Sequence, residues 1–168
     1  AGIHALPVHD RTPACRFHGE AEHATLATVR QAVDIPVFAN GDIDSPAKAV
    51  EVLRATGADG IMIGRAAQGR PWIFSEIDAL LEGRVKPPPA IPEVRDIMLT
   101  HLRDLYEFYG PEPGVRIARK HIGWYCSGRP LAQAFRQSVM QAVSVETQLA
   151  QVSDYFDALE DSAAAVAA

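Results

Sequence analysis

Two short polar segments that contain glycine are placed where an anion could bind. Asn40-Gly41-Asp42 and Gly64-Arg65 each follow directly on a short apolar run. Glycine lets the backbone approach a ligand closely, and the planar guanidinium of Arg65 matches phosphate oxygens. We predict that these five residues form a phosphate site, with Asn40 fixing its loop and Asp42 accepting hydrogen bonds from backbone amides or a ligand hydroxyl. Ordinary turns are the alternative, because Asn-Gly-Asp is also a good turn sequence.

A histidine and an arginine follow another apolar run, in His9-Asp10-Arg11-Thr12. At the carboxyl end of a strand, His9 could form a hydrogen bond with a cofactor ring, and Arg11 could reach the same edge. Structural surface residues are the alternative. Cys15 lies a few residues further on, and we assign it no catalytic role, because its loop does not direct it at a ring and a lone cysteine is usually inert.

A third group of candidate residues is basic. At 100° per residue, Arg116, Arg119 and Lys120 fall on one side of a helix and point outward together. The stretch from Gly114 to Val145 contains no Asp or Glu, so we expect no neighbouring acid to pair with them and propose that they contact RNA phosphates. A solvated helix face is the alternative. The adjacent Trp124-Tyr125 pair could stack on bases or belong to the core.

The elements that carry the first two groups alternate in kind. Short runs rich in Ile and Val, interleaved with amphipathic stretches, are typical of βα units with a parallel sheet. We expect strands over residues 3–8, 35–39 and 60–63, with a helix after each, the last over about residues 71–81. The middle helix should begin at Ser45-Pro46 and end at Gly57. Its buried stripe is expected to be Ala49, Val50 and Leu53.

The pattern changes after residue 83. Prolines over residues 84–92 predict a stiff linker, and residues 93–161 have the apolar spacing of four helices. The third of these helices should bury Leu131, Phe135, Val139 and Ala142. Residues 162–168 are expected to be a frayed tail. The predicted fold class is therefore α/β followed by all-α, with a small helical bundle as the second domain.

Composition excludes several classes of protein. A formal net charge of -5 argues against non-specific coating of nucleic acid, and the two cysteines, Cys15 and Cys126, lie too far apart for a zinc site. No metal is therefore expected. The absence of a run of about 18 apolar residues and of a signal-peptide layout predicts a cytoplasmic protein with no membrane partner.

The chain opens directly in an apolar run, and its three βα units cannot close a barrel, which needs about 250 residues. We therefore expect a longer parent protein. Four segments in order resemble tRNA-dihydrouridine synthases of the bacterial B type, over nearly the whole chain. They are residues 8–12 (VHDRT), 35–43 (IPVFANGDI), 56–72 (TGADGIMIGRAAQGRPW) and 119–125 (RKHIGWY).

The resemblance implies that residues 1–83 are the last βα units of an FMN-binding TIM (β/α)8 barrel and that residues 93–161 bind tRNA. Such enzymes take hydride from NADPH and reduce the C5–C6 bond of uridines in tRNA. The resemblance places the flavin phosphate at Asn40, Gly41, Asp42, Gly64 and Arg65, and His9 near the flavin ring. It also implies that Arg116, Arg119 and Lys120 grip the tRNA and that the full-length protein is a monomer.

The chain departs from the family pattern in two ways. Asp10 replaces the glycine usual between His and Arg and adds a negative charge near the flavin. The family's catalytic Cys and a flavin-contacting Lys belong to earlier strands, so the chain alone is expected to be inactive. Two alternatives stay open, another FMN-binding TIM-barrel dehydrogenase and a non-catalytic RNA-binding fragment.

Overall fold

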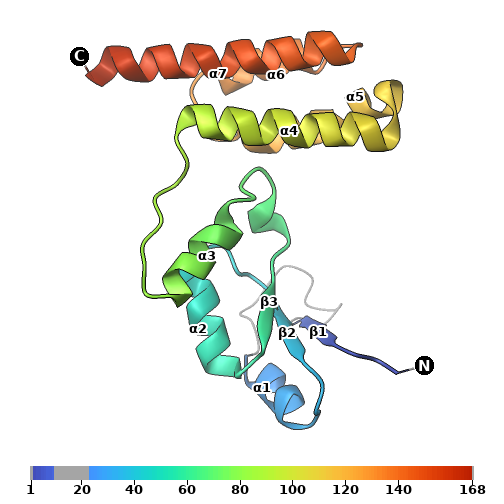
Figure 1. The fold of residues 1–168 in the computed structure, drawn as a ribbon, viewed down its shortest axis with the longest axis vertical. Coiled ribbons are helices and arrows are strands. Elements are labelled where there is room, and N and C mark those ends of the chain that lie inside the picture. The colour runs from blue at the N-terminus through green and yellow to red at the C-terminus, as the bar shows by residue number, and fades with distance from the viewer. Residues whose placement is uncertain (1, 10–22, 168) are drawn as a thin grey trace. The chain divides into compact units, whose positions relative to one another are not determined.

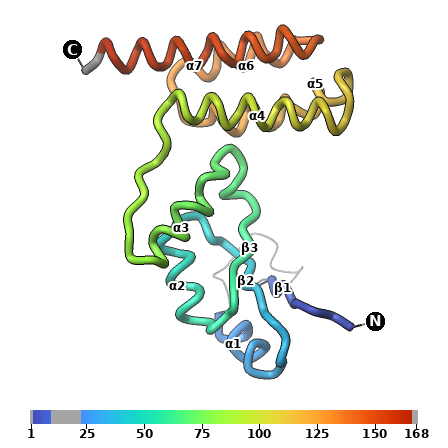
Figure 2. Tube along the Cα trace, viewed as in Figure 1, coloured from blue at the N-terminus to red at the C-terminus, as the bar shows by residue number. Residues whose placement is uncertain are grey.

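The computed structural model describes residues 2–9 and 23–167. The chain divides into two compact units, Ala1–Pro87 and Pro88–Ala168, and each is described by itself. Figures 1 and 2 trace the chain through both units.

The described part of the first unit alternates strands with helices (Figure 1). Its elements are β1 (Leu6–His9), α1 (His23–Gln31), β2 (Val37–Asn40), α2 (Pro46–Thr56), β3 (Gly60–Met62), a 3-10 turn η1 (Arg65–Ala67) and α3 (Ile73–Leu81). The strands form a parallel sheet in the order β1-β2-β3, as the alternating pattern predicts. Each strand is shorter than expected, and η1 was not expected at all.

The helices cover one face of this sheet. Val37 and Ala39 of β2 are buried, while Phe38 between them is 36% exposed and Met62 of β3 is 53% exposed. Because strand side chains alternate between faces, the core lies on the side of Val37 and Ala39. It joins β2 to α1, α2 and α3 through Leu26, Val37, Ala39, Ile43, Ala49, Val52, Ile73 and Ile77. The opposite face of the sheet carries Phe38 and Met62.

Helix α2 has the predicted ends but not the whole predicted stripe. The Ser45 hydroxyl accepts a hydrogen bond from the Lys48 amide, and Gly57 ends the helix at φ 64°. Ala49 is buried as expected, whereas Val50 and Leu53 are only partly buried. Val52 and Thr56 are buried in their place. The prediction of the stripe was wrong for Val50 and Leu53, because the side of α2 that packs on the core carries Val52 and Thr56. The buried Thr56 hydroxyl donates a hydrogen bond to Val52 O at 2.7 Å, which offsets its loss of contact with water.

Asp59, immediately before β3, links the first residue of β2 to the last turn of α1. Its carboxylate accepts a hydrogen bond from the Val37 amide at 2.8 Å and pairs with Arg30 at 2.9 Å. The Val37 amide and the Arg30 guanidinium together hold the pKa of Asp59 below its ordinary value, because both favour the charged carboxylate. The Asp59 amide also donates to Val37 O at 2.9 Å, so Asp59 and Val37 are joined by two hydrogen bonds where β2 and β3 begin.

The described residues of the second unit form only helices. These are α4 (Ile91–Tyr109), α5 (Pro111–Tyr125), α6 (Ala132–Val139) and α7 (Val145–Ala167), with α4 packed on both α5 and α7. Gln148 of α7 is fully buried among them. It accepts a hydrogen bond from the Tyr106 hydroxyl at 2.7 Å and donates one to Val115 O at 3.3 Å. A single buried amide thus joins three helices.

Three boundaries in and around this unit differ from expectation. Helix α4 begins at Ile91, inside the predicted 84–92 linker, because Pro92 is tolerated in a first turn and the Glu93 carboxylate accepts the Ala90 amide at 2.8 Å. Leu131 is 59% exposed at φ 58° and precedes α6, so it is not part of a buried stripe. Helix α7 continues through Ala167, where a frayed tail was expected, because alanine is the strongest helix former.

Candidate functional site

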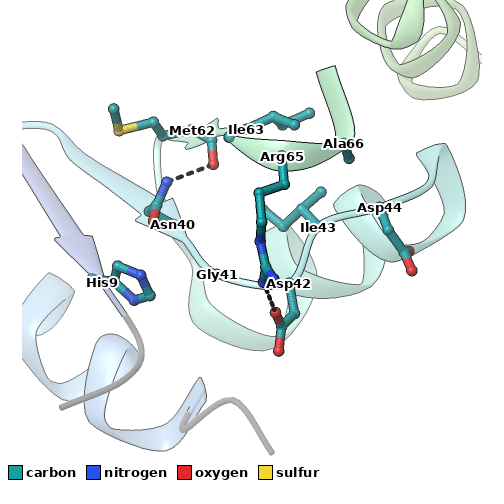
Figure 3. Close-up of a pocket in the computed structure, with 11 residues that line it drawn as sticks. His9, Asn40, Gly41, Asp42, Ile43, Asp44, Met62, Ile63, Arg65 and Ala66 are labelled. Carbon is teal, nitrogen blue, oxygen red and sulfur yellow. Dashed lines mark hydrogen bonds and ion pairs between the residues drawn. The ribbon is translucent and has the colours of Figure 1, made fainter. Parts of the chain in front are cut away.

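The residues predicted to bind a phosphate lie around one cavity. It has a volume of about 810 Å³ and opens at the carboxyl ends of β2 and β3 (Figure 3). Parallel strands place their carboxyl ends on the same edge of a sheet, which brings the loop after β2 beside the loop after β3. All six predicted cofactor residues line it, namely His9, Asn40, Gly41, Asp42, Gly64 and Arg65.

Asn40 links the two loops. Its side-chain amide nitrogen donates a hydrogen bond to Met62 O at 2.9 Å, across the ends of β2 and β3 (Figure 3). The same two residues are partners in the register of the strands. Asn40 therefore holds the start of the Gly41 loop against β3, as its predicted role requires.

Arg65 and Asp42 form an ion pair across the cavity, which was not foreseen. Arg65 Nη2 lies 3.3 Å from Asp42 Oδ1 (Figure 3). The Arg65 side chain is 67% exposed and that of Asp42 is 34% exposed. Because water screens a pair at such a site, Asp42 can hold the guanidinium at the cavity without preventing it from contacting an anion.

The backbone of both loops suits close approach of a ligand. Gly41 has φ 153° and Asp42 has φ 38°, a left-handed conformation that Asp tolerates better than most residues. A Cβ built on Gly64 would meet no atom of the described residues within 4 Å. Packing against those residues therefore does not explain the glycine at position 64. The open space in front of its backbone fits a group such as a phosphate.

His9 reaches the cavity from the neighbouring strand. It ends β1, is in register with Asn40 and is exposed. Asp10, Arg11, Thr12 and Cys15, on which the sequence raised further questions, lie outside the described residues.

Five residues that were not selected from the sequence also line the cavity. They are Ile43, Asp44, Met62, Ile63 and Ala66, each one or two positions from a selected residue. Met62 could have been selected from the sequence, because side chains alternate along a strand and Met62 lies on the sheet face that the helices do not cover. For Asp44 there was no such signal, since its place depends on the path of the loop.

The basic residues of α5 do not share one environment. Arg116 and Lys120 are exposed, but Arg116 Nη2 lies 3.2 Å from Glu112 Oε1, one helical turn earlier. The expectation that no acid pairs with these residues was wrong for Arg116, because residues four apart are neighbours on a helix and Glu112 lies just outside the acid-free stretch. The side chains of Arg116 and Glu112 are 70% and 81% exposed.

Arg119 also differs from expectation. It is only partly exposed, and its Nη2 donates a hydrogen bond to Ala142 O at 3.2 Å. The side chain therefore lies against the segment between α6 and α7 and does not point outward with Arg116 and Lys120. Helical phase could not predict this, because the carbonyl of Ala142 is brought there by tertiary packing.

Four rings form a cluster between α4 and α5. The centroids of His101 and His121 are 4.8 Å apart, those of His121 and Trp124 are 4.9 Å apart, and the Tyr125 hydroxyl lies 3.3 Å from His101 Nδ1. Lys120 Nζ lies 5.8 Å from the centroid of Trp124. Tyr125 is buried in the core, whereas Trp124 is half-buried.

Burial keeps the cluster uncharged. Desolvation, together with the nearby His101 and Lys120, lowers the pKa of His121 to about 4. Burial also lowers the pKa of His101 and raises that of Tyr125 to about 12. Neutral rings at neutral pH offer stacking surfaces beside the positive charge of Lys120.

Within the described residues, no three His, Cys, Asp or Glu side chains gather as they would to hold a metal ion. Nor does any helix formed by these residues have the length and apolar character needed to cross a membrane.

Comparison with known proteins gives consistent matches. The family described as dihydrouridine synthase matches residues 1–161. The tRNA-dihydrouridine synthase B of Xanthomonas axonopodis pv. citri is 57% identical over 159 residues, which are 94% of this chain and 48% of the relative. The tRNA-dihydrouridine synthase B of Pseudomonas aeruginosa is 53% identical over an alignment of 169 positions, which covers 100% of this chain and 51% of the relative. The tRNA-dihydrouridine synthase B of Escherichia coli K12 is 49% identical over 157 residues, which are 93% of this chain and 49% of the relative.

The chain thus spans about half the length of the curated relatives that it matches. The match extends from the loops that line the cavity into the helical unit, and it confirms the resemblance inferred from four motifs. On this basis the chain belongs to the dihydrouridine synthase family.

Proposed function

We propose that this chain is the C-terminal part of an FMN-dependent tRNA-dihydrouridine synthase and that the cavity at β2 and β3 receives the flavin phosphate. The observation that carries the proposal is that two glycine-containing loops and Arg65 line one cavity in a member of this family. Asn40 would hold the two loops together, Gly41 and Gly64 would admit the phosphate, and Arg65 would pair with it. His9 would contact the flavin ring from β1.

FMN held here would supply hydride transfer from NADPH to the C5–C6 double bond of a uridine, and the catalytic cysteine implied by the family resemblance would supply the proton. The residues of this chain would anchor and orient the cofactor. We infer that the catalytic cysteine that the family resemblance implies is not among the residues of this chain. We infer that activity requires the segment that corresponds to the other half of the relatives, and that this chain alone does not reduce uridine.

The same segment would complete the barrel. The sheet face with Phe38 and Met62 is not covered by α1, α2 or α3. In a TIM barrel, helices cover the outer face of each strand and side chains of the other strands fill the interior. We assign Phe38 and Met62 to that interior and residues 1–83 to its last βα units.

The helical unit would bind the tRNA, and the protein would act in the cytoplasm as a monomer. Of the three predicted residues, Arg116 and Lys120 are exposed and would contact phosphates, while Arg119 would mainly position the segment at Ala142. Trp124, beside Lys120, offers a ring for base stacking.

The test uses the full-length protein with Arg65→Ala, and Arg54→Ala on α2 as the control, because Arg54 is exposed and does not line the cavity. We expect wild type and Arg54→Ala to purify with flavin absorbance and to restore dihydrouridine to the tRNA of a strain lacking the enzyme. Arg65→Ala should lose most of the flavin. A wild-type protein without flavin that leaves tRNA unmodified would refute the proposal. Salt-dependent tRNA binding by that same protein would favour the non-catalytic alternative.

A further inference from the structure

The end of β2 and the loop that follows it are joined at every second residue to the end of β3 and the segment that follows it. Asn40 donates to Met62 O, Asp42 pairs with Arg65, and Asp44 O accepts a hydrogen bond from Arg70 Nη1 at 3.4 Å. The first two contacts involve residues that line the cavity at both ends. The third differs, because Arg70 is not part of the cavity lining.

Arg70 is itself fixed by a buried acid. Its Nη2 lies 2.6 Å from Oε2 of Glu76, in the first turn of α3, and the Glu76 side chain is only 5% exposed. A carboxylate with so little contact with water needs a charged partner. The Arg70 amide also donates to Ala67 O at 3.1 Å, in the turn that follows η1. The guanidinium is therefore held on one side by α3 and reaches the β2–α2 loop with its other nitrogen.

This loop has a conformation that needs support. Asp42 is at φ 38°, a region that costs energy for any residue with a side chain. Arg70 fastens the carbonyl two residues later, immediately before the Ser45 N-cap of α2. The strained turn is thus held on both sides, by Asn40 before it and by Arg70 after it.

We propose that Arg70 and Glu76 are positioning residues for the flavin phosphate, acting through the loop of residues 41–44. The inference rests on the proposed function of the cavity. A guanidinium is suited to this task because its planar fork serves two acceptors at fixed directions, here Glu76 and Asp44 O, whereas an ammonium group is a single point charge.

The experiment compares FMN with riboflavin, which lacks the phosphate, in titrations of the flavin-free full-length protein followed by flavin fluorescence. Arg70→Lys keeps a positive charge beside buried Glu76 but loses the fork. We expect it to weaken FMN binding about tenfold, as the loss of one charge-assisted hydrogen bond implies, and to leave riboflavin binding unchanged. The double variant Arg70→Gln/Glu76→Gln removes the buried charge together with its partner and should behave in the same way.

The matched control is Arg84→Gln, which breaks the ion pair with Glu82 at an exposed site of the same unit and should alter neither affinity. A wild-type protein that does not prefer FMN to riboflavin would refute the phosphate site itself. A wild type that prefers FMN, with Arg70→Lys keeping the full preference, would refute only the positioning role. Equal weakening of both ligands would show a general structural effect and would also overturn it.

Discussion

Four arginines of this chain illustrate how surroundings decide what a residue can do. Arg65 is exposed at the cavity beside Asp42, and Arg70 joins a buried acid to a loop carbonyl. Arg116 pairs with Glu112 on the surface, while Arg119 is held by Ala142 O. The sequence predicted a role in binding for Arg65, Arg116 and Arg119 and missed Arg70. A guanidinium can donate hydrogen bonds to a phosphate, a carboxylate or a backbone carbonyl, so its residue type does not identify its partner.

His121 provides a pH-dependent prediction at this scale. Its pKa is lowered to about 4 in the folded chain, from 6.5, so the unfolded chain takes up its proton first as the pH falls. The stability associated with neutral His121 is complete above pH 6.5 and is lost as the pH falls toward 4. After allowance for solvent screening, we expect a loss on the order of 1 kcal/mol in wild type, and less in His121→Gln.

Urea denaturation followed by circular dichroism at pH 7.5 and pH 4.5 measures this difference. His4→Gln, an exposed change in the first unit, is the control and should follow wild type. The interpretation would be wrong if His121→Gln lost as much stability on acidification as wild type does.

At the scale of elements, the sequence predicted correctly those features that depend on residues close together in the chain. Ser45, Pro46 and Gly57 marked the ends of α2 correctly, because capping involves residues within one turn. The buried stripe of α2 and the role of Leu131 were predicted wrongly. Which side of a helix is covered depends on the elements packed against it, and the sequence pattern of α2 fits more than one rotation.

Gln148 provides a prediction about how the helices are joined. Gln148→Leu keeps a similar volume but leaves the Tyr106 hydroxyl and Val115 O without their buried partner. We expect a loss of about 3 kcal/mol in the free energy of unfolding, from two unsatisfied polar groups. Tyr106→Phe in the same background should recover part of it, and exposed Gln133→Leu should have little effect. Thermal unfolding of wild type, Gln148→Leu, Tyr106→Phe and the double variant closes the cycle, and strict additivity would contradict the coupling.

Lys120 provides a prediction about RNA binding by α5. If it contacts a tRNA phosphate, Lys120→Ala in the full-length protein should reduce the slope of log affinity against log salt by about 1. Arg103→Ala, an exposed change on α4, is the control for loss of one positive charge. Filter binding at several salt concentrations measures both slopes. Equal slopes for wild type and Lys120→Ala would argue against a phosphate contact at this residue.

For the whole molecule, the division into two units depends on a short connection. Residues 82–90 join α3 to α4, and Val85 within them is 90% exposed. Successive prolines lack amide donors, so neither α3 nor α4 extends through this connection.

Limited proteolysis tests this division. Among bonds within residues 23–167, we expect trypsin to cut first between Arg84 and Val85, because Lys86 precedes a proline and other basic residues lie mainly in helices. The fragment after the cut should keep its helical circular dichroism. Arg84→Gln should delay the cut, and earlier cleavage inside α4 or α5 would contradict the independence of the second unit.

The sequence by itself determined what adjacent residues encode: three strands, the caps of α2, the proline-rich connection and the four motifs that indicate the family. Each of these depends on contacts within a turn or on a fixed order of residue types. The tertiary structure alone decided that the loops after β2 and β3 line one cavity, that Arg70 donates a hydrogen bond to the loop after β2, and that Gln148 joins three helices. These partners lie far apart in the chain, and only the path of the folded backbone brings them within hydrogen-bonding distance.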